Sequence, residues 1–240
     1  MKVKRALKRF LYYGWRRKCP LCNRTFRRFF SIPANRRKDA ECPYCCSKER
    51  HRLLCLYLLQ KKLVLHGKRM LHFAPDPSFL RMFRRQNGLN YHTADLKGDY
   101  VDERVDICSL PHPDKSFDFV ICFHILEHIL DDRIALKELF RVLKDSGTLF
   151  VMVPLYGETT FEDSSVVTPA KRKQLFGQED HVRKYGWDIL DRFRAAGFET
   201  SLFTADDLNL PKKQVEYFGA CLPGETLIVA KPEQHSRAPL

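Results

Sequence analysis

The sequence lacks a hydrophobic run long enough to cross a membrane. Its longest apolar candidate, Phe117 to Leu126, is shorter than the roughly 18 residues that a span requires and contains Asp118 and His124. No secretory hydrophobic segment, internal repeat or low-complexity tract is visible. We therefore expect a cytoplasmic protein with no transmembrane segment, and 240 residues leave room for one large domain and a small appendage.

Acidic residues are scarce in the first part of the chain. Residues 1–69 contain 21 Lys and Arg but 3 Asp and Glu, a net charge of +18. Residues 70–240 contain 21 Lys and Arg and 26 Asp and Glu, a net charge of −5. Such a field attracts polyanions such as RNA or anionic lipid, although a basic face that keeps the protein soluble explains it equally well. Residues 1–13 also show a short basic amphipathic helix pattern, which suits a membrane surface or, more commonly, docking on the protein's own domain.

The nine cysteines do not suggest a disulfide framework, because their number is odd and four of them form two CPxC pairs. These pairs are Cys19 with Cys22 and Cys42 with Cys45. The spacing predicts a tetrahedral zinc site whose metal stabilises a basic segment with little apolar core. Iron, or four unrelated buried thiols, are the alternatives. Cys46 is a spare ligand or, more simply, a passive neighbour, and the remainder fit small core residues: Cys55, Cys108, Cys122 and Cys221.

The hydrophobic pattern divides the chain into a zinc-ribbon module over residues 1–50, a linking helix within 51–67 and an α/β domain over 68–240. We predict a seven-stranded, mostly parallel sheet with helices on both faces. The predicted strands are 70–74, 89–94, 104–107, 117–123, 148–153, 198–203 and 226–230. The predicted helices are 51–65, 78–85, 131–143 and 187–196, with Gly147 and Gly197 at helix-to-strand turns.

Several stretches of the α/β region follow a familiar order. Val105-Asp106-Ile107-Cys108-Ser109-Leu110-Pro111 is followed by Asp114-Lys115-Ser116-Phe117-Asp118-Phe119-Val120, and then by His124-Ile125-Leu126-Glu127-His128. A helix ending in Arg141-Val142-Leu143-Lys144 then turns at Ser146-Gly147 into a strand. Over residues 68–156 this order resembles class I S-adenosylmethionine-dependent methyltransferases of the methyltransferase-11 type. The segment 176–186 is similar to a subset of these enzymes with an N-terminal zinc ribbon.

The resemblance implies a Rossmann-like fold and an S-adenosylmethionine site at the carboxyl ends of the strands. Asp95 would bind the ribose hydroxyls and Asp106, beside Ile107, the adenine. Phe123 and His124 would lie by the sulfonium. The first loop and the residue after Asp95 complete the predicted site: Ala74, Pro75, Asp76 and Leu96. This loop lacks the glycines usual in the family, which also argues against a dinucleotide-binding oxidoreductase.

Methyl transfer needs an aligned acceptor and, for hydroxyl or amine acceptors, a base. The candidate bases are His181 and His124, and Arg183 near His181 is a candidate clamp for an anionic acceptor. The predicted function is methyl transfer to a small-molecule or glycan acceptor. The alternatives are a ribosomal or transfer RNA methyltransferase and a non-catalytic zinc-ribbon adaptor. His124 to His128 also spells H-x-x-E-H, a metalloprotease motif that would need a helix and a third ligand downstream.

Overall fold

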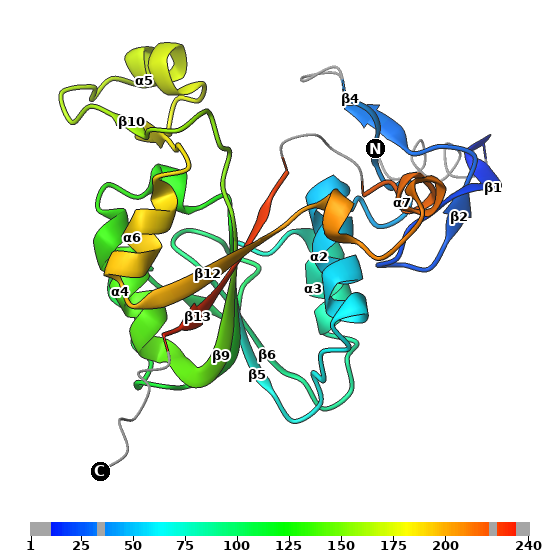
Figure 1. The fold of residues 1–240 in the computed structure, drawn as a ribbon, viewed down its shortest axis with the longest axis horizontal. Helices are drawn as coiled ribbons and strands as arrows, with labels where there is room; N and C mark the ends of the chain where they lie inside the picture. The colour runs from blue at the N-terminus through cyan, green and yellow to red at the C-terminus, as the bar shows by residue number, and fades with distance from the viewer. Residues whose placement is uncertain (1–10, 33–36, 221–224, 234–240) are drawn as a thin grey trace. The chain divides into compact units, whose positions relative to one another are not determined.

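The computed structural model describes residues 11–32, 37–220 and 225–233, which form two compact units (Figure 1). The first, here called the cysteine unit, combines the described parts of Met1–His66, Asp76–Gly88 and Phe203–Leu227. The second, the sheet unit, combines those of Gly67–Pro75, Leu89–Leu202 and Ile228–Leu240. The division into residues 1–50, 51–67 and 68–240 stays a prediction. Cys221 and most of the expected N-terminal helix lie outside the described residues.

The cysteine unit holds two small antiparallel hairpins. Strand β1 (Tyr13–Lys18) pairs with β2 (Thr25–Phe26), and β3 (Phe30–Ile32) pairs with β4 (Arg37–Glu41). Helices α2 (Glu49–Gln60), α3 (Pro77–Phe83) and α7 (Lys212–Phe218) belong to the same unit, as does the 3₁₀ turn η3 (Ala205–Asp207). Helix α2 therefore begins two residues earlier and ends five residues earlier than the predicted linking helix.

The sheet unit is built on seven strands in the order β12-β13-β9-β8-β5-β6-β7. Their bounds are β5 (Arg69–Phe73), β6 (Asn90–Asp95), β7 (Glu103–Arg104), β8 (Phe117–Phe123), β9 (Leu143–Met152), β12 (Phe198–Phe203) and β13 (Leu227–Pro232). The neighbouring pairs among β7, β6, β5, β8 and β9 are parallel, while β13 runs antiparallel to β9. The predicted seven-stranded, mostly parallel sheet is confirmed.

Helices α4 (Asp132–Val142) and α6 (Ile189–Ala195) lie side by side against this sheet (Figure 1). Leu136 and Leu139 of α4 join Phe193 of α6 in one buried cluster with Val120 and Val151 from the strands. The 3.6-residue period of α4 brings its apolar side chains to one face, and Asp131 caps its amino end by accepting from two backbone N–H groups. The core therefore fixes the strand that carries His124 and the helix that follows it.

Two strands differ from their predicted bounds. Strand β7 has two residues rather than four, because Asp106 leaves the strand and accepts a hydrogen bond from the Cys108 N–H. Strand β9 starts at Leu143, so Gly147 lies inside it rather than in a turn. Gly197 does occupy a turn, with φ of +93°.

An insertion after β9 contains elements that the sequence did not reveal. They are β10 (Phe161–Glu162), α5 (Pro169–Phe176) and β11 (Arg183–Lys184). Strands β10 and β11 pair antiparallel, and α5 ends at Gly177 in the left-handed conformation. No helix in the described part of the chain is long and apolar enough to cross a membrane.

Candidate functional site

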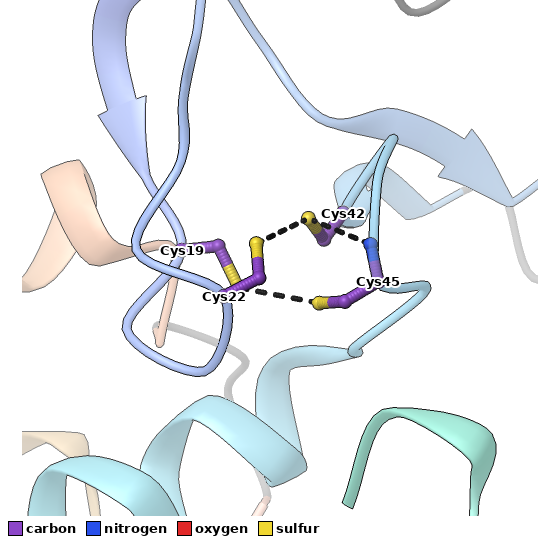
Figure 2. Close-up of side chains that lie close together, drawn as sticks. All are labelled: Cys19, Cys22, Cys42 and Cys45. Carbon is purple, nitrogen blue, oxygen red and sulfur yellow. Dashed lines mark hydrogen bonds between the residues drawn. The ribbon is translucent and has the colours of Figure 1, made fainter. Parts of the chain in front are cut away.

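The four predicted metal ligands meet in the cysteine unit (Figure 2). Cys19 and Cys22 lie on the turn after β1, and Cys42 and Cys45 on the turn after β4. Both turns are closed alike: Asn23 N–H donates to the Cys19 carbonyl at 2.8 Å, and Cys46 N–H donates to the Cys42 carbonyl at 3.0 Å. Asn23 and Cys46 both have positive φ, so Cys46 occupies a backbone position that favours glycine, outside the four-sulfur cluster.

The sulfur positions fit a tetrahedral metal site. Four sulfurs bound to zinc at about 2.3 Å in a tetrahedron lie about 3.8 Å apart. The Sγ atoms of Cys19 and Cys45 are 3.5 Å apart, and those of Cys22 and Cys42 are 3.7 Å apart. The Cys45 N–H donates to Cys42 Sγ at 3.5 Å, as outer-shell donors to a thiolate do. Iron satisfies the same sulfur geometry.

Arg52 provides an electrostatic reason for negative charge on these sulfurs. Its side chain is fully buried and donates to the carbonyls of Ser47, Ala40 and Gly219 at 2.6 to 2.9 Å. Burial lowers the pKa of this guanidinium, while the charges of Cys19, Glu49 and the neighbouring cysteines favour its cationic form. A metal bound by four thiolates carries a net charge of about −2 and would offset this buried cation.

The predicted cofactor residues lie at one edge of the sheet unit. Strands β5, β6 and β8 are parallel neighbours, and Phe73 pairs with both Ala94 and Cys122. Their carboxyl ends therefore lead together into Ala74, Asp95 and His124. The chain passes from β5 to β6 on one side and returns to β8 on the other, which makes this edge the topological switch point where ligands bind in such sheets.

Two residues at this edge have an unusual backbone. Ala74 has φ of +43° and His124 has φ of +54°, in the left-handed region that favours glycine. Each is held by a backbone hydrogen bond of 2.8 Å to a neighbouring strand, from Ala74 N–H to the Ala94 carbonyl and from His124 N–H to the Met152 carbonyl. The glycine-free loop thus turns as a glycine would, with only a methyl group added at residue 74. Backbone strain of this kind concentrates at ligand sites.

The remaining predicted cofactor residues differ in exposure and partners. Asp95 closes its own turn by accepting from the Lys97 and Gly98 N–H groups at 2.8 and 3.1 Å. Asp106 is exposed and Ile107 is buried. Pro75 is buried, Phe123 is half-buried and Leu96 is exposed.

Asp76 belongs to the cysteine unit and already has partners there. It precedes α3, and its Oδ2 lies 2.7 Å from His51 Nε2 and 3.5 Å from Arg50. Burial raises the pKa of Asp76, but the hydrogen bond and charge of His51 outweigh it and lower the pKa overall. This carboxylate therefore stabilises the start of α3.

The two predicted bases lie in different surroundings. His124 is half-buried, and its Nδ1 lies 3.2 Å from Glu127 Oε1. His181 is 2% exposed, and its ring meets that of His128 edge to face. Burial, and then the charge of His128, lower the pKa of His181. Its imidazole is therefore neutral near pH 7.

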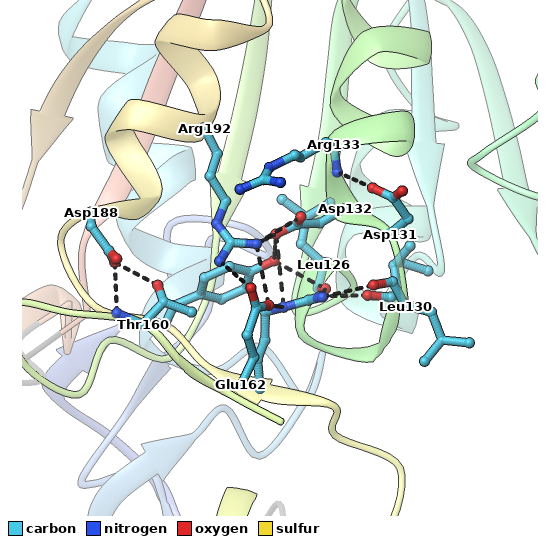
Figure 3. Close-up of polar contacts among 12 residues, drawn as sticks. Leu126, Leu130, Asp131, Asp132, Arg133, Thr160, Glu162, Asp188 and Arg192 are labelled. Atoms are coloured by element: carbon cyan, nitrogen blue, oxygen red, sulfur yellow. Dashed lines mark hydrogen bonds and ion pairs between the residues drawn. The ribbon is translucent and has the colours of Figure 1, made fainter. Parts of the chain in front are cut away.

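Arg183 is not available as a clamp for an anionic acceptor. It is 4% exposed, and its guanidinium donates to the carbonyls of Leu126, Ile129 and Leu130 and to Glu162. Of these partners, Leu126, Leu130 and Glu162 are labelled in Figure 3. Tyr185 is also buried, with its hydroxyl 2.5 Å from Asp132 Oδ2. Both side chains hold the turn after β8 in place.

The H-x-x-E-H segment lacks the scaffold of a protease motif. His124 ends a strand with a left-handed backbone, and the 3₁₀ turn η2 (Leu126–His128) carries the other two residues. Metalloproteases place this motif within one α-helix, so the protease interpretation is wrong for this chain.

The strand order, the parallel register and the ligand edge define a Rossmann-like sheet of the class I methyltransferase type. Residues 58–151 match the family described as "Methyltransferase domain". A probable S-adenosylmethionine-dependent methyltransferase of Mycolicibacterium smegmatis is 38% identical over 79 residues, which is 30% of each chain. One of Mycobacterium tuberculosis is 39% identical over 51 residues, 21% of this chain and 19% of that protein. The match spans less than a third of either curated relative.

Solved structures share the fold. A chain in the complex of the Haloferax volcanii Trm112 methyltransferase activator has a TM-score of 0.50 and 17% identity over 77% of this chain and 94% of that one. A Haemonchus contortus phosphoethanolamine N-methyltransferase bound to S-adenosylmethionine has a TM-score of 0.51 and 14% identity over 76% and 53%. Residues 58–151 therefore match a methyltransferase domain, and the fold is that of class I S-adenosylmethionine-dependent methyltransferases.

Sequence reasoning missed one group of side chains. Glu127, His128 and His181 bring their ligand atoms within 4.8 Å of one another. The H-x-x-E-H pattern is a signal for metal binding, but its spacing alone indicates a protease motif and gives no third ligand. The third member follows far along the chain, and only the fold shows that it returns to the same place.

Proposed function

We propose that this protein transfers the methyl group of S-adenosylmethionine to a small-molecule or glycan acceptor. The observation that carries this proposal is the meeting of Ala74, Asp95 and His124 at the switch point of the sheet. The family match over residues 58–151 supports the same chemistry. The bound cofactor would supply the activated methyl group, and the protein would supply alignment and proton removal.

The proposed cofactor contacts follow the strand ends. The backbone of Ala74 and Pro75 would lie along the methionine part, and Asp95 would accept hydrogen bonds from the ribose hydroxyls. Asp106 and Ile107 would contact the adenine, with Leu96 beside the ribose. Phe123 and His124 would flank the sulfonium. Asp76 follows Pro75 directly and stays among the proposed contacts. Its carboxylate already contacts His51.

His124 is suited to accept the acceptor's proton. Glu127 is an acceptor when ionised, so His124 Nδ1 carries the hydrogen and donates it at 3.2 Å. The lone pair is then on Nε2, which has no hydrogen-bond partner among the described residues. His181 is the second proposed base. It is buried against the His128 ring, so the acceptor's proton would have to reach it by way of His128.

Calorimetry of the metal-loaded full chain with S-adenosylmethionine and S-adenosylhomocysteine tests the cofactor site. We expect both to bind, and we expect Asp95→Asn to weaken binding at least tenfold because the ribose loses a charged acceptor. Asp145→Asn is the matched control, since Asp145 lies near the amino end of β9 and pairs with Lys115. Absence of binding by the wild-type protein would overturn the proposal and favour a non-catalytic adaptor.

Turnover in a methyl-transfer assay tests the bases. His181→Ala should leave cofactor binding within a few-fold of wild type, and both His124→Gln and His181→Ala should reduce turnover by about 10²-fold or more. Unchanged turnover would remove that imidazole from the reaction.

We propose that zinc at Cys19, Cys22, Cys42 and Cys45 has a structural role. The four protein ligands leave no position for a substrate. Elemental analysis should find at least one zinc ion per chain, and an iron spectrum instead would replace zinc in this proposal.

A polyanionic acceptor such as RNA is the second candidate, and one observation favours it. Strand β1 exposes Tyr13 and Trp15 at 57% and 71%, next to exposed Arg16. Aromatic rings beside cations form stacking surfaces for single-stranded nucleic acid. RNA binding should then weaken steeply with salt and fall about tenfold in Trp15→Ala, while exposed Tyr156→Ala in the sheet unit serves as control.

A further inference from the structure

A second set of metal-binding side chains lies in the sheet unit. Glu127 and His128 lie on η2, and His181 lies just before β11. One ligand atom from each lies within 4.8 Å of the others, and the His128 and His181 ring centroids are 4.6 Å apart. Two imidazoles and one carboxylate form the donor set of many catalytic zinc sites and of non-haem iron sites.

These side chains are buried without the partners that buried polar groups need. Glu127 and His181 are each 2% exposed. Within the described residues, Glu127 Oε2 and both ring nitrogens of His181 have no hydrogen bond of ordinary geometry. Burying such groups without partners is costly, and an ion is one of the standard explanations for a cluster of them.

The partners that do exist leave one atom of each side chain for an ion. Glu127 Oε1 accepts from His124, which leaves Oε2. His128 Nδ1 lies 3.2 Å from Asp180 Oδ2, which leaves Nε2. Neither ring nitrogen of His181 has a hydrogen bond of ordinary geometry among the described residues, so either one can face an ion. A carboxylate partner such as that of His128 orients metal-binding imidazoles.

A separate polar network holds the turn that carries Glu127 and His128. The Arg183 guanidinium donates to the carbonyls of Leu126, Ile129 and Leu130. The Val182 N–H donates to the Glu127 carbonyl at 2.9 Å. Because Val182 and Arg183 directly follow His181, these bonds fix η2 against the segment that supplies the third ligand. The three donors are thus arranged before any ion binds.

We propose that Glu127, His128 and His181 bind one divalent transition-metal ion. Three protein ligands leave at least one coordination position open, as in catalytic rather than structural zinc sites. The donor set favours zinc or iron(II) over magnesium, which prefers oxygen ligands. Because Glu127 contacts His124, the ion would lie near the carboxyl edge of the sheet.

The consequence for the acceptor rests on the proposed methyl transfer. An acceptor hydroxyl bound at the open position would ionise more easily, since zinc lowers the pKa of bound water to about 7. The hydroxyl proton would go to His124 Nε2, the oxygen would form a bond to the methyl carbon, and the carbon–sulfur bond would break with its electron pair staying on sulfur. The proposed acceptor class is therefore an oxygen nucleophile, and in this arrangement His181 would hold the ion instead of serving as the second base.

Zinc counting without cofactor tests the site directly. Full-length protein equilibrated with buffered zinc and freed of excess metal should contain two ions per chain by elemental analysis. Glu127→Gln, His128→Asn and His181→Asn should each contain one, held by the cysteines. His112→Asn is the matched control and should keep two, because His112 lies 2.9 Å from Glu103 in the same unit but belongs to neither ligand cluster among the described residues.

Cobalt identifies the ligands of the second ion. The first equivalent of Co²⁺ should give thiolate charge-transfer absorption, and the second should add only the weak bands of nitrogen and oxygen ligands. His128→Asn guards against misfolding of the two buried variants, since the His128 side chain is 30% exposed, and near-ultraviolet circular dichroism checks each fold.

One zinc ion in the wild-type protein, or two in folded His128→Asn and Glu127→Gln, would overturn the proposal. Because no cofactor is present in these measurements, its failure is distinct from failure of methyl transfer. Protein that binds S-adenosylmethionine but one zinc ion refutes only the second site, whereas two ions without cofactor binding refute only the methyltransferase function.

Discussion

In the cysteine unit the four proposed ligands come from two short turns, whereas in the sheet unit the three proposed ligands come from η2 and from a segment far along the chain. The cysteine turns are closed by local backbone bonds and carry little core, so the metal itself would hold them together. The Glu127, His128 and His181 cluster is instead fixed by Arg183 and Val182 before any ion binds. A structural site depends on its ion, while a catalytic site needs a frame that survives without it.

Removal of the cysteine-bound metal should have the largest effect. Structural zinc contributes an apparent free energy of about 10–16 kcal/mol in small zinc domains, so Cys42→Ser should unfold the hairpins β1–β2 and β3–β4. Hydrogen exchange should show lost protection there and retained protection in β5, β8 and β9. Cys46→Ser is the control, because Cys46 lies outside the cluster. Protected hairpins in Cys42→Ser would mean that burial alone folds them.

Arg183→Met should have the next largest effect and should act on the other unit. It leaves the Ile129 and Leu130 carbonyls without their Arg183 donor, whereas Glu162 keeps Arg192 and the Leu126 carbonyl keeps Tyr185. Each buried group left unpaired costs roughly 1–3 kcal/mol. Urea unfolding measures the loss, and Arg194→Met is the control because its side chain is 74% exposed. The second zinc ion should also bind less tightly. Equal stability of the two variants would show that the network does not fix the turn.

The buried histidine His51 offers a test of how stability depends on pH. Burial lowers the pKa of His51 to about 4, so below pH 6.5 the unfolded chain binds a proton that the fold excludes. Stability should be full above about pH 6.5 and fall by about 3 kcal/mol as pH drops to about 4. The loss should be smaller in His51→Asn. Both proteins lose zinc in acid alike, so the difference between their unfolding free energies isolates His51, and parallel pH curves would contradict the assignment.

The strained backbone at the ligand edge should give the smallest effect. Ala74→Gly relieves a left-handed conformation, which offsets the entropy that glycine adds to the unfolded chain, so stability should change by less than about 1 kcal/mol. Ala94→Gly, in the neighbouring buried strand, should lose about 1 kcal/mol or more. Thermal unfolding compares the two. A larger loss in Ala74→Gly would show that its methyl group makes a needed contact.

Local chemistry in the sequence predicted much of this arrangement. The CPxC spacing placed four sulfurs together because each pair is one turn, and buried apolar runs such as Phe117–Phe123 predicted their strand to the residue. The lysine- and arginine-rich insertion around α5 gave no such signal, because its helix buries only Phe176. The sequence suggested that Arg183 is an exposed clamp, because it cannot show that this side chain is buried and donates to three backbone carbonyls.

The site at the sheet edge was predictable only in part. Asp95 and His124 follow strand ends, and strand ends in parallel sheets share an edge. Asp76 also follows a strand, but its carboxylate contacts His51, which is too far away in the sequence for this contact to be predicted. The meeting of His181 with Glu127 depends on long-range packing, which spacing does not reveal.

Arg52 ties the charge of the sulfurs to the fold of the unit around them. Oxidation of two of the four cysteines to a disulfide would release the metal and remove negative charge at the same time. The guanidinium would then remain buried with its main counter-charge gone, and burying an uncompensated charge costs several kcal/mol. Mild oxidants should therefore release the metal and unfold this region in a single step.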